Sequence, residues 1–166
     1  MKSTTQRIVF TALLTALVCV ATMIIKIPLP SKGYINIGDA VVLLSGWLLS
    51  PLYGFLAAGI GSALADIFSG YIIYAPATFV IKGIMSLLSC ILFKKVFLNS
   101  KKVFSRIISG LIAEIVMVGG YFLFEGLLYG FMTAAANIPA NAIQGTAGII
   151  LGLLLVEVFE KSRIEF

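Results

Sequence analysis

Apolar residues gather in six stretches along the chain, and short polar or turn-rich segments separate them. The stretches cover residues 7–25, 38–50, 51–68, 75–97, 107–129 and 135–159. A helix needs about 20 predominantly apolar residues to cross a bilayer, so each stretch predicts one membrane span. The second and third are short for a full span, and Ser50-Pro51 marks the turn between them. The pattern predicts an all-α integral membrane protein, a single domain over residues 1–166 with six transmembrane helices.

Turn-forming residues mark the ends of the first and third stretches. Lys26, Pro28 and Pro30 end the first, and we predict a polar, turn-rich loop over residues 28–37. A loop rich in glycine and tyrosine, residues 69–74, follows the third. The first stretch is long for the core of a cleaved signal peptide, and no convincing small-x-small cleavage site follows it. We therefore expect it to remain as a membrane helix.

Composition strengthens the membrane assignment. The chain has 166 residues, of which 60% are hydrophobic and 11% charged, whereas soluble domains are roughly 45–50% apolar and about 25% charged. This balance excludes an ordinary soluble domain and a nucleic-acid-binding protein. There is no histidine, and Cys19 and Cys90 both lie in apolar stretches. We therefore expect no metal site and no cofactor, and we expect both cysteines to be small buried residues.

The basic residues are distributed unequally between the two ends of the predicted bundle. Six spans put both termini on one side, and that side holds nine basic residues: Lys2, Arg7, Lys94, Lys95, Lys101, Lys102, Arg106, Lys161 and Arg163. The other side holds only Lys26 and Lys32. Because basic residues concentrate in cytoplasmic segments, we predict cytoplasmic termini in a multi-pass plasma-membrane protein of bacterial type.

Polar residues inside the predicted spans are the candidate functional groups, because an ionisable group in a membrane is costly and tends to mark function. At 1.5 Å of rise per residue, five of them fall in one layer toward the outer side. They are Lys82, Tyr121, Glu125, Asn141 and Gln144. Two interpretations are compatible. The five line an outward-facing cavity, or they form a structural network in which Lys82 pairs with Glu125 or Glu114.

Other residues near the outer side have less specific signals. Asp66 closes the third stretch, where it would meet a partner lysine or solvent. Four aromatic residues lie in or beside the outer loops and would stack on a flat ligand or form an interfacial belt: Tyr34, Tyr71, Tyr74 and Phe131. Below Gln144, Gly148 and Gly152 continue the same helix face and predict a tight helix crossing.

Several short motifs resemble one known family. The segment from Gly33 to Gly83 contains GDA at 38–40, GxGSAxAD at 59–66, YAPA at 74–77 and IKG at 81–83. Near the end, PANxxQ at 139–144 fits as well. These motifs resemble the substrate-binding S components of energy-coupling factor (ECF) vitamin transporters. The likeness is to the group with riboflavin-type and pyridoxine- or hydroxymethylpyrimidine-type members, and it extends over essentially the whole chain.

The resemblance implies a division of labour. An S component binds a vitamin from outside and docks on a coupling membrane subunit that carries two cytoplasmic ATPases. Ala12 and Ala16, a small-residue pair on the first helix, would face the coupling subunit. The pocket would combine the outer halves of the last three helices with outer loops, which adds Asn36 and Tyr74 to the five polar residues. The loop that holds Gly33, Tyr34 and Asn36 would act as a lid.

The sequence itself contains no glycine-rich loop followed by Lys-Ser/Thr, so we expect a binding subunit and not an enzyme. One cation, carboxylates, amides and tyrosines would suit a small heteroaromatic vitamin with hydroxyls. Pyridoxine or hydroxymethylpyrimidine fits best, and riboflavin is the alternative ligand. The alternative of a different class is a stand-alone secondary transporter with Lys82, Glu114 and Glu125 as a proton or ion relay.

Overall fold

The computed structural model describes residues 4–29, 33–96 and 101–161. Its elements, in chain order, are α1 (Thr4–Ile24), β1 (Lys26–Pro28), β2 (Tyr34–Asn36), α2 (Asp39–Leu48), α3 (Pro51–Phe68), α4 (Ala75–Ile91), the π-helical turn η1 (Leu92–Val96), α5 (Lys102–Tyr129) and α6 (Phe131–Lys161). Lys2, Lys32, Phe97 and Arg163 belong to the predictions above but lie outside the described residues.

Each apolar stretch forms one helix, as predicted, but the helices differ in length. Five are long and apolar enough to cross a membrane: α1, α3, α4 with its π-helical extension, α5 and α6. The sixth, α2, has ten residues. At 1.5 Å per residue it is roughly 15 Å long, about half the thickness of the hydrocarbon core.

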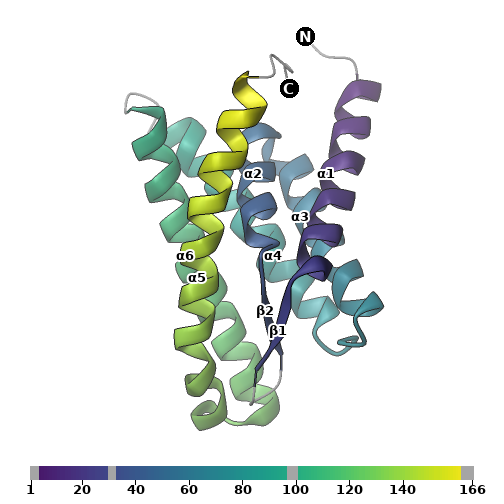
Figure 1. The fold of residues 1–166 in the computed structure, drawn as a ribbon, viewed down its shortest axis with the longest axis vertical. Helices are drawn as coiled ribbons and strands as arrows, with labels where there is room; N and C mark the ends of the chain where they lie inside the picture. The colour runs from purple at the N-terminus through teal and green to yellow at the C-terminus, as the bar shows by residue number, and fades with distance from the viewer. Residues whose placement is uncertain (1–3, 30–32, 97–100, 162–166) are drawn as a thin grey trace.

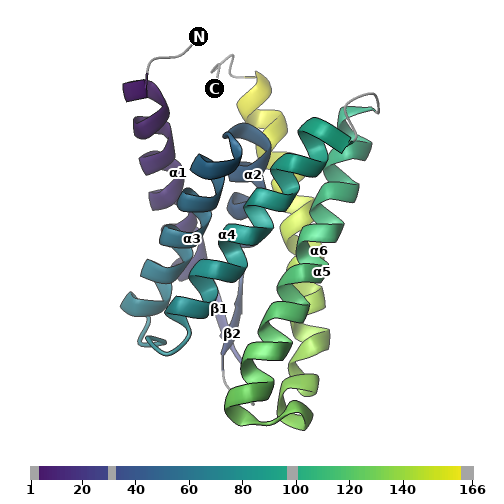
Figure 2. The same cartoon turned by 180° about the vertical axis from the view of Figure 1, so that it is seen from behind.

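The two ends of the helix bundle carry different features (Figures 1 and 2). The start of α1, the end of α6, the turn η1 and the start of α5 lie at one end, which we call the terminal end. The β1–β2 hairpin, the α3–α4 connection and the α5–α6 turn lie at the other, the hairpin end. Among the described residues, all the basic side chains except Lys26 and the buried Lys82 belong to segments near the terminal end.

The segment predicted as a loop over 28–37 instead contains strand β2, which pairs with β1 in a two-stranded antiparallel sheet. Lys26 pairs with Asn36, Ile27 with Ile35 and Pro28 with Tyr34. Pro28 follows the end of α1, as expected, but it favours an extended backbone that can pair with a second strand, and Pro30 lies outside the described residues. Strand β2 then leads directly into α2, so α2 begins well inside the bundle (Figure 1). This entry from the hairpin explains why α2 is short.

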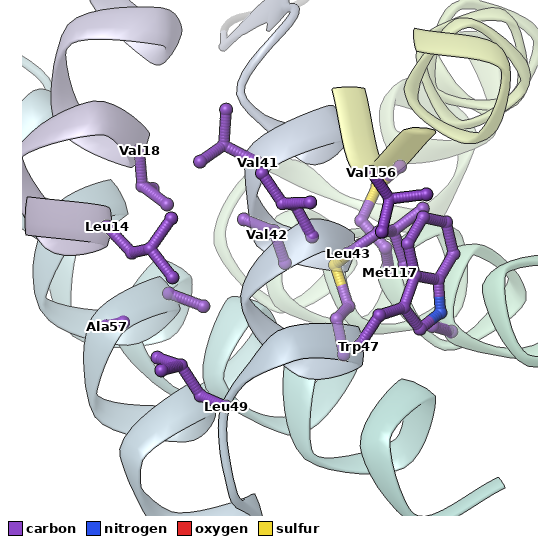
Figure 3. Packing of buried hydrophobic residues seen from close by; sticks show 14 of the residues in the cluster. Leu14, Val18, Val41, Val42, Leu43, Trp47, Leu49, Ala57, Met117 and Val156 are labelled. Atoms are coloured by element: carbon purple, nitrogen blue, oxygen red, sulfur yellow. The ribbon is translucent and has the colours of Figure 1, made fainter. Parts of the chain in front are cut away.

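The hydrophobic core surrounds α2. Every residue from Asp39 to Trp47 is buried. On one side α2 meets Leu14 and Val18 of α1, and on the other it meets Met117 and Val156 (Figure 3). Because α2 is buried all round, most of its residues are apolar, and the polar Asp39 and Ser45 are hydrogen-bonded within the protein.

Small residues allow helices to approach closely at the two crossings that position the site. A Cβ on Gly61 of α3 would lie 2.8 Å from the Cβ of Val18 on α1. A Cβ on Gly148 of α6 would lie 2.8 Å from the Cβ of Asp39, and one on Gly152 would lie 3.2 Å from the carbonyl oxygen of Ala40. The predicted tight crossing below Gln144 is confirmed, and α2 is the helix that α6 crosses.

Candidate functional site

A polar cavity lies between the hairpin and the bundle at the hairpin end. All seven residues predicted to contact substrate line it: Asn36, Tyr74, Lys82, Tyr121, Glu125, Asn141 and Gln144. The lining is completed by Thr22, Leu29, Gly33, Tyr34, Ser62, Asp66 and Thr78. Its free volume is about 30 Å³, which is small beside the roughly 300–1,000 Å³ of typical ligand pockets. The hairpin and the surrounding side chains therefore fill most of this space.

A buried ion pair anchors the inner wall of the cavity. Lys82 of α4 donates to Oδ1 of Asp39, the first residue of α2, and both side chains are almost completely buried. The amide Nε2 of Gln144 on α6 donates to Oδ2 of the same carboxylate at 2.6 Å. Asp39 also benefits from the N-terminus of its own helix, where a negative charge is stabilised. The interpretation in which Lys82 pairs with Glu125 or Glu114 was therefore wrong, because its partner is Asp39.

Gln144 also ties the hairpin to the bundle. Its Oε1 accepts a hydrogen bond from the backbone N–H of Asn36 at 2.7 Å. The side-chain oxygen of Asn36 in turn accepts from the backbone N–H of Gly38 at 2.8 Å. One amide thus links β2, the start of α2 and α6, because both ends of the Gln144 side chain are used.

The outer part of the cavity contains a second carboxylate, Glu125 of α5. Asn137 donates from Nδ2 to Oε2 of Glu125 at 2.7 Å, and the Tyr74 hydroxyl donates to Oε1 at 3.4 Å. Tyr121, one turn away on α5, shares a 3.0 Å hydrogen bond with Thr78 of α4. The Lys82 ammonium lies 5.4 Å from the centre of the Tyr121 ring, within cation–π range.

Asp66 faces the cavity and is neither solvated nor paired with a lysine, which corrects the sequence-based expectation. It is 4% exposed, and its Oδ1 accepts a 2.6 Å hydrogen bond from the Tyr34 hydroxyl of β2. Burial and the neighbouring Asp66 charge raise the pKa of Tyr34 above its usual range, so the phenol keeps the proton that it donates. On the same side, Lys26 donates to the Ser69 hydroxyl at 2.7 Å. Together these contacts fasten the hairpin to the end of α3.

Three residues considered from the sequence lie outside the cavity lining: Glu114, Phe131 and Tyr71, whose ring centre is 4.7 Å from that of Tyr34. Glu114 is buried between α5 and α6, and both its carboxylate oxygens lack a hydrogen-bond partner within the described part of the chain. A Cβ on Gly145 would lie 2.9 Å from one of these oxygens. Phe131 is half exposed and packs on Phe122 with ring centres 5.5 Å apart. We therefore assign none of the three to the cavity.

A separate apolar groove runs along the outside of α1 and α3. Ala12 and Ala16, the predicted coupling-subunit contacts, line it and are exposed. The opposite wall comes from α3 and includes Tyr53, Leu56 and Ile60. The groove holds about 620 Å³ and is almost entirely apolar. It could take the side of another helix, because the alanines leave room for close approach.

The sequence analysis missed four polar residues of the site: Thr22, Asp39, Ser62 and Thr78. Asp39 stands at the boundary of an apolar stretch, which suggests a loop position and not an interior one. Ser62 lies in a run of glycines and alanines that suggests packing. A usable signal did exist for Ser62, because it lies four residues before Asp66 and thus shares a helix face with it.

Comparison with known families agrees with this arrangement. Residues 2–161 match the family described as "ECF-type riboflavin transporter, S component". The chain belongs to this family of S components. The resemblance suggested by the short motifs is thereby confirmed, and the all-helical membrane fold and the transport role of the family follow from it.

Two relatives and one solved structure are similar to this S component along most of its length. A protein of Pyrococcus woesei described as "Uncharacterized protein in gap 3'region" is 41% identical over 87% of this chain and 95% of that relative. The thiamine precursor transporter HmpT of Lactococcus lactis is 26% identical over 96% of this chain and 90% of its own length. A solved chain described as "Structure and mechanism of the S component of a bacterial ECF transporter" has a TM-score of 0.78 and 24% identity. The match covers 98% of this chain and 100% of that one, and it supports the fold.

Proposed function

We propose that this S component captures a hydroxymethylpyrimidine-type ligand from outside the cell for an ATP-driven importer. The observation that carries the proposal is the cavity: residues from the hairpin, α4, α5 and α6 converge on one small polar space. The similarity to a thiamine precursor transporter favours a pyrimidine as the ligand. Its hydroxyl would donate to the Glu125 carboxylate, a ring nitrogen would accept from the Asn141 amide, and Tyr74 or Tyr121 would stack on the ring.

Two other vitamins remain candidate ligands. Riboflavin is favoured by the description of the matching family, but its three fused rings would need a much larger expansion of a cavity of about 30 Å³ than a single ring would. Pyridoxine has one ring and fits the same polar groups. In each case the ligand enters when the β1–β2 hairpin moves, because Asn36 and Tyr34 hold it against the bundle.

The proposed placement in the membrane follows from the distribution of charge. The terminal end carries most of the basic residues, so we assign it to the cytoplasm and the cavity to the outer side of the plasma membrane. With α2 counted as a short sixth span, both termini are cytoplasmic. The groove that contains Ala12 and Ala16 would receive the coupling subunit, which carries two cytoplasmic ATPases.

The proposal is tested by identifying the ligand. The protein is purified in mild detergent and denatured, and released small molecules are identified by mass spectrometry. Emptied protein is then titrated calorimetrically with hydroxymethylpyrimidine, pyridoxine and riboflavin. Calorimetry is preferable to fluorescence because the single Trp47 is buried in the core and does not line the cavity. We expect submicromolar binding of the pyrimidine, and failure of all three to bind would overturn the proposal.

Uptake assays separate the importer from a stand-alone secondary transporter. Cells that contain the S component with a coupling subunit and its ATPases should accumulate the ligand, and cells with the S component alone should not. Accumulation without the ATPases that is abolished by a protonophore would support the secondary transporter instead. In that case Glu114, buried and without a hydrogen-bond partner among the described residues, would be the first relay residue to substitute.

A further inference from the structure

Four hydrogen-bond donors of the cavity are already engaged within the protein. The Lys82 ammonium and the Gln144 amide N–H both point to Asp39. The Tyr34 and Tyr74 hydroxyls donate to Asp66 and Glu125. A ligand in this space therefore has to bind the lining groups that these hydrogen bonds leave unpaired.

The α3 wall carries two of the unsatisfied groups. The side-chain oxygen of Ser62 and Oδ2 of Asp66 are both buried, and neither has a hydrogen-bond partner in the described structure. Ser62 is 1% exposed and Asp66 4% exposed, and both line the cavity. The two residues are one turn apart on α3, so their side chains lie on the same face of the helix. Native proteins rarely leave such atoms unpaired, so a pair of them at one cavity wall calls for an explanation.

Within the described residues, no neighbouring element places a donor within hydrogen-bond distance of Oδ2 of Asp66. Tyr34 occupies the other oxygen of Asp66 at 2.6 Å. Thr78 of α4 shares a 3.0 Å hydrogen bond with Tyr121, and its hydroxyl helps to stabilise the Asp66 carboxylate without reaching Oδ2. Lys82 and Lys26 act on Asp66 through longer-range electrostatic attraction, and their own hydrogen bonds go to Asp39 and Ser69.

We propose that Ser62 and Asp66 form a ligand-binding wall that selects a heteroaromatic ring bearing an amino or protonated nitrogen. Oδ2 of Asp66 accepts the N–H of that nitrogen, and the Ser62 hydroxyl donates to an adjacent ring nitrogen. The edge of an aminopyrimidine presents this pair, a donor beside an acceptor. The inference rests on the proposed function, since it takes the polar cavity as the substrate site, and it adds α3 to the helices that contact the ligand.

The test compares two ligands that differ by one donor. The first is 4-amino-5-hydroxymethyl-2-methylpyrimidine, and the second is 5-hydroxymethyl-2-methylpyrimidine, which has no N–H group. Their dissociation constants are measured calorimetrically with the whole protein in detergent. We expect the amino compound to bind at least about tenfold tighter, which corresponds to about 1.4 kcal/mol.

The Asp66→Asn variant tests whether Asp66 causes the preference for the amino compound. Asn keeps an oxygen for the Tyr34 hydroxyl but turns an N–H₂ group toward the ligand, so the preference for the amino compound should fall below about threefold. Glu114→Gln is the matched control, because it also removes one buried carboxylate but from a side chain that does not line the cavity. Its preference should stay at the wild-type value. If Asp66→Asn does not yield folded protein, the same ratio is measured on Ser62→Ala, where we expect a loss of threefold or more.

The outcomes separate the two proposals. A wild-type protein that binds both pyrimidines equally, or an Asp66→Asn variant that retains the full preference, would overturn the α3 wall and leave the proposed function standing. A wild-type protein that binds neither pyrimidine would overturn the proposed substrate, and the inference about its amino group with it. A tenfold preference that is lost in Asp66→Asn and kept in Glu114→Gln supports both.

Discussion

Lys82→Met is expected to destabilise the protein strongly, because it leaves the Asp39 charge without a counter-charge. The Asp39 side chain is 0% exposed and that of Lys82 is 4% exposed. Breaking a buried ion pair by removing one partner typically costs about 3–5 kcal/mol. The Gln144 amide, 2.6 Å from Asp39, remains as a neutral donor and compensates only in part. We therefore expect a loss of about 3 kcal/mol or more in the free energy of unfolding.

A double-mutant cycle isolates the interaction between the two charges. Asp39→Asn keeps the shape of the side chain and can retain the Gln144 hydrogen bond, and the combined variant removes both charges. Because neither charge is then left buried alone, the double variant should be more stable than the sum of the single effects predicts, by about 2 kcal/mol or more. Equilibrium unfolding in mixed detergent, followed by circular dichroism, measures all four free energies.

A surface ion pair provides the control for this cycle. Lys161 and Glu157 form a 2.8 Å ion pair on α6, with side chains 77% and 61% exposed. Lys161→Met, Glu157→Gln and their combination should show a coupling of less than about 1 kcal/mol. If the Lys82–Asp39 cycle is additive to within about 0.5 kcal/mol, the ion pair does not anchor the cavity and the reasoning is refuted.

Three further predictions test other parts of the molecule. Asn141→Ala should weaken ligand binding about tenfold by calorimetry, as expected for a buried polar contact worth about 1–3 kcal/mol, and unchanged affinity would remove Asn141 from the site. Ala12→Trp or Ala16→Trp should abolish ATP-dependent uptake while ligand binding persists; Leu13→Trp, exposed on α1 but outside the groove, is the control. Gly148→Ala should destabilise the protein by about 1–3 kcal/mol because its Cβ would lie 2.8 Å from that of Asp39. Gly119→Ala, with no atom within 4 Å of the new Cβ, should not.

The helices could be predicted because apolar length and turn residues are local properties of the sequence. Pro51 starts α3 at the expected turn. α5 ends at Tyr129, the predicted boundary, and Gly130 follows it with φ of 91°. The depth argument also succeeded for α4, α5 and α6, because the rise per residue fixes the height of each side chain along a straight helix. That is why Lys82, Tyr121 and Gln144 line one cavity.

The remainder of the site depends on contacts between segments far apart in the chain. The local sequence of residues 26–36 does not predict that two three-residue strands will pair. It also does not predict that the hairpin will cover the end of α3. The Tyr34–Asp66 hydrogen bond joins residues 32 positions apart. Without the hairpin, Asp66 would be a solvated helix end, as its position in the sequence suggests. Pairing across such separations is set by tertiary packing, which spacing within one helix cannot reveal.

Asp39 shows most clearly how this hidden packing changes the interpretation of a visible residue. Lys82 is conspicuous in the sequence as a cation in a membrane span, and a direct contact with substrate is the natural expectation. In the fold, however, its ammonium is held by Asp39. Lys82→Ala would thus lower ligand affinity even if Lys82 never touched the ligand, because the α2, α4 and α6 walls would lose their common ion pair. Asn141 lines the same cavity without a part in that pair, so it is the cleaner probe of direct binding.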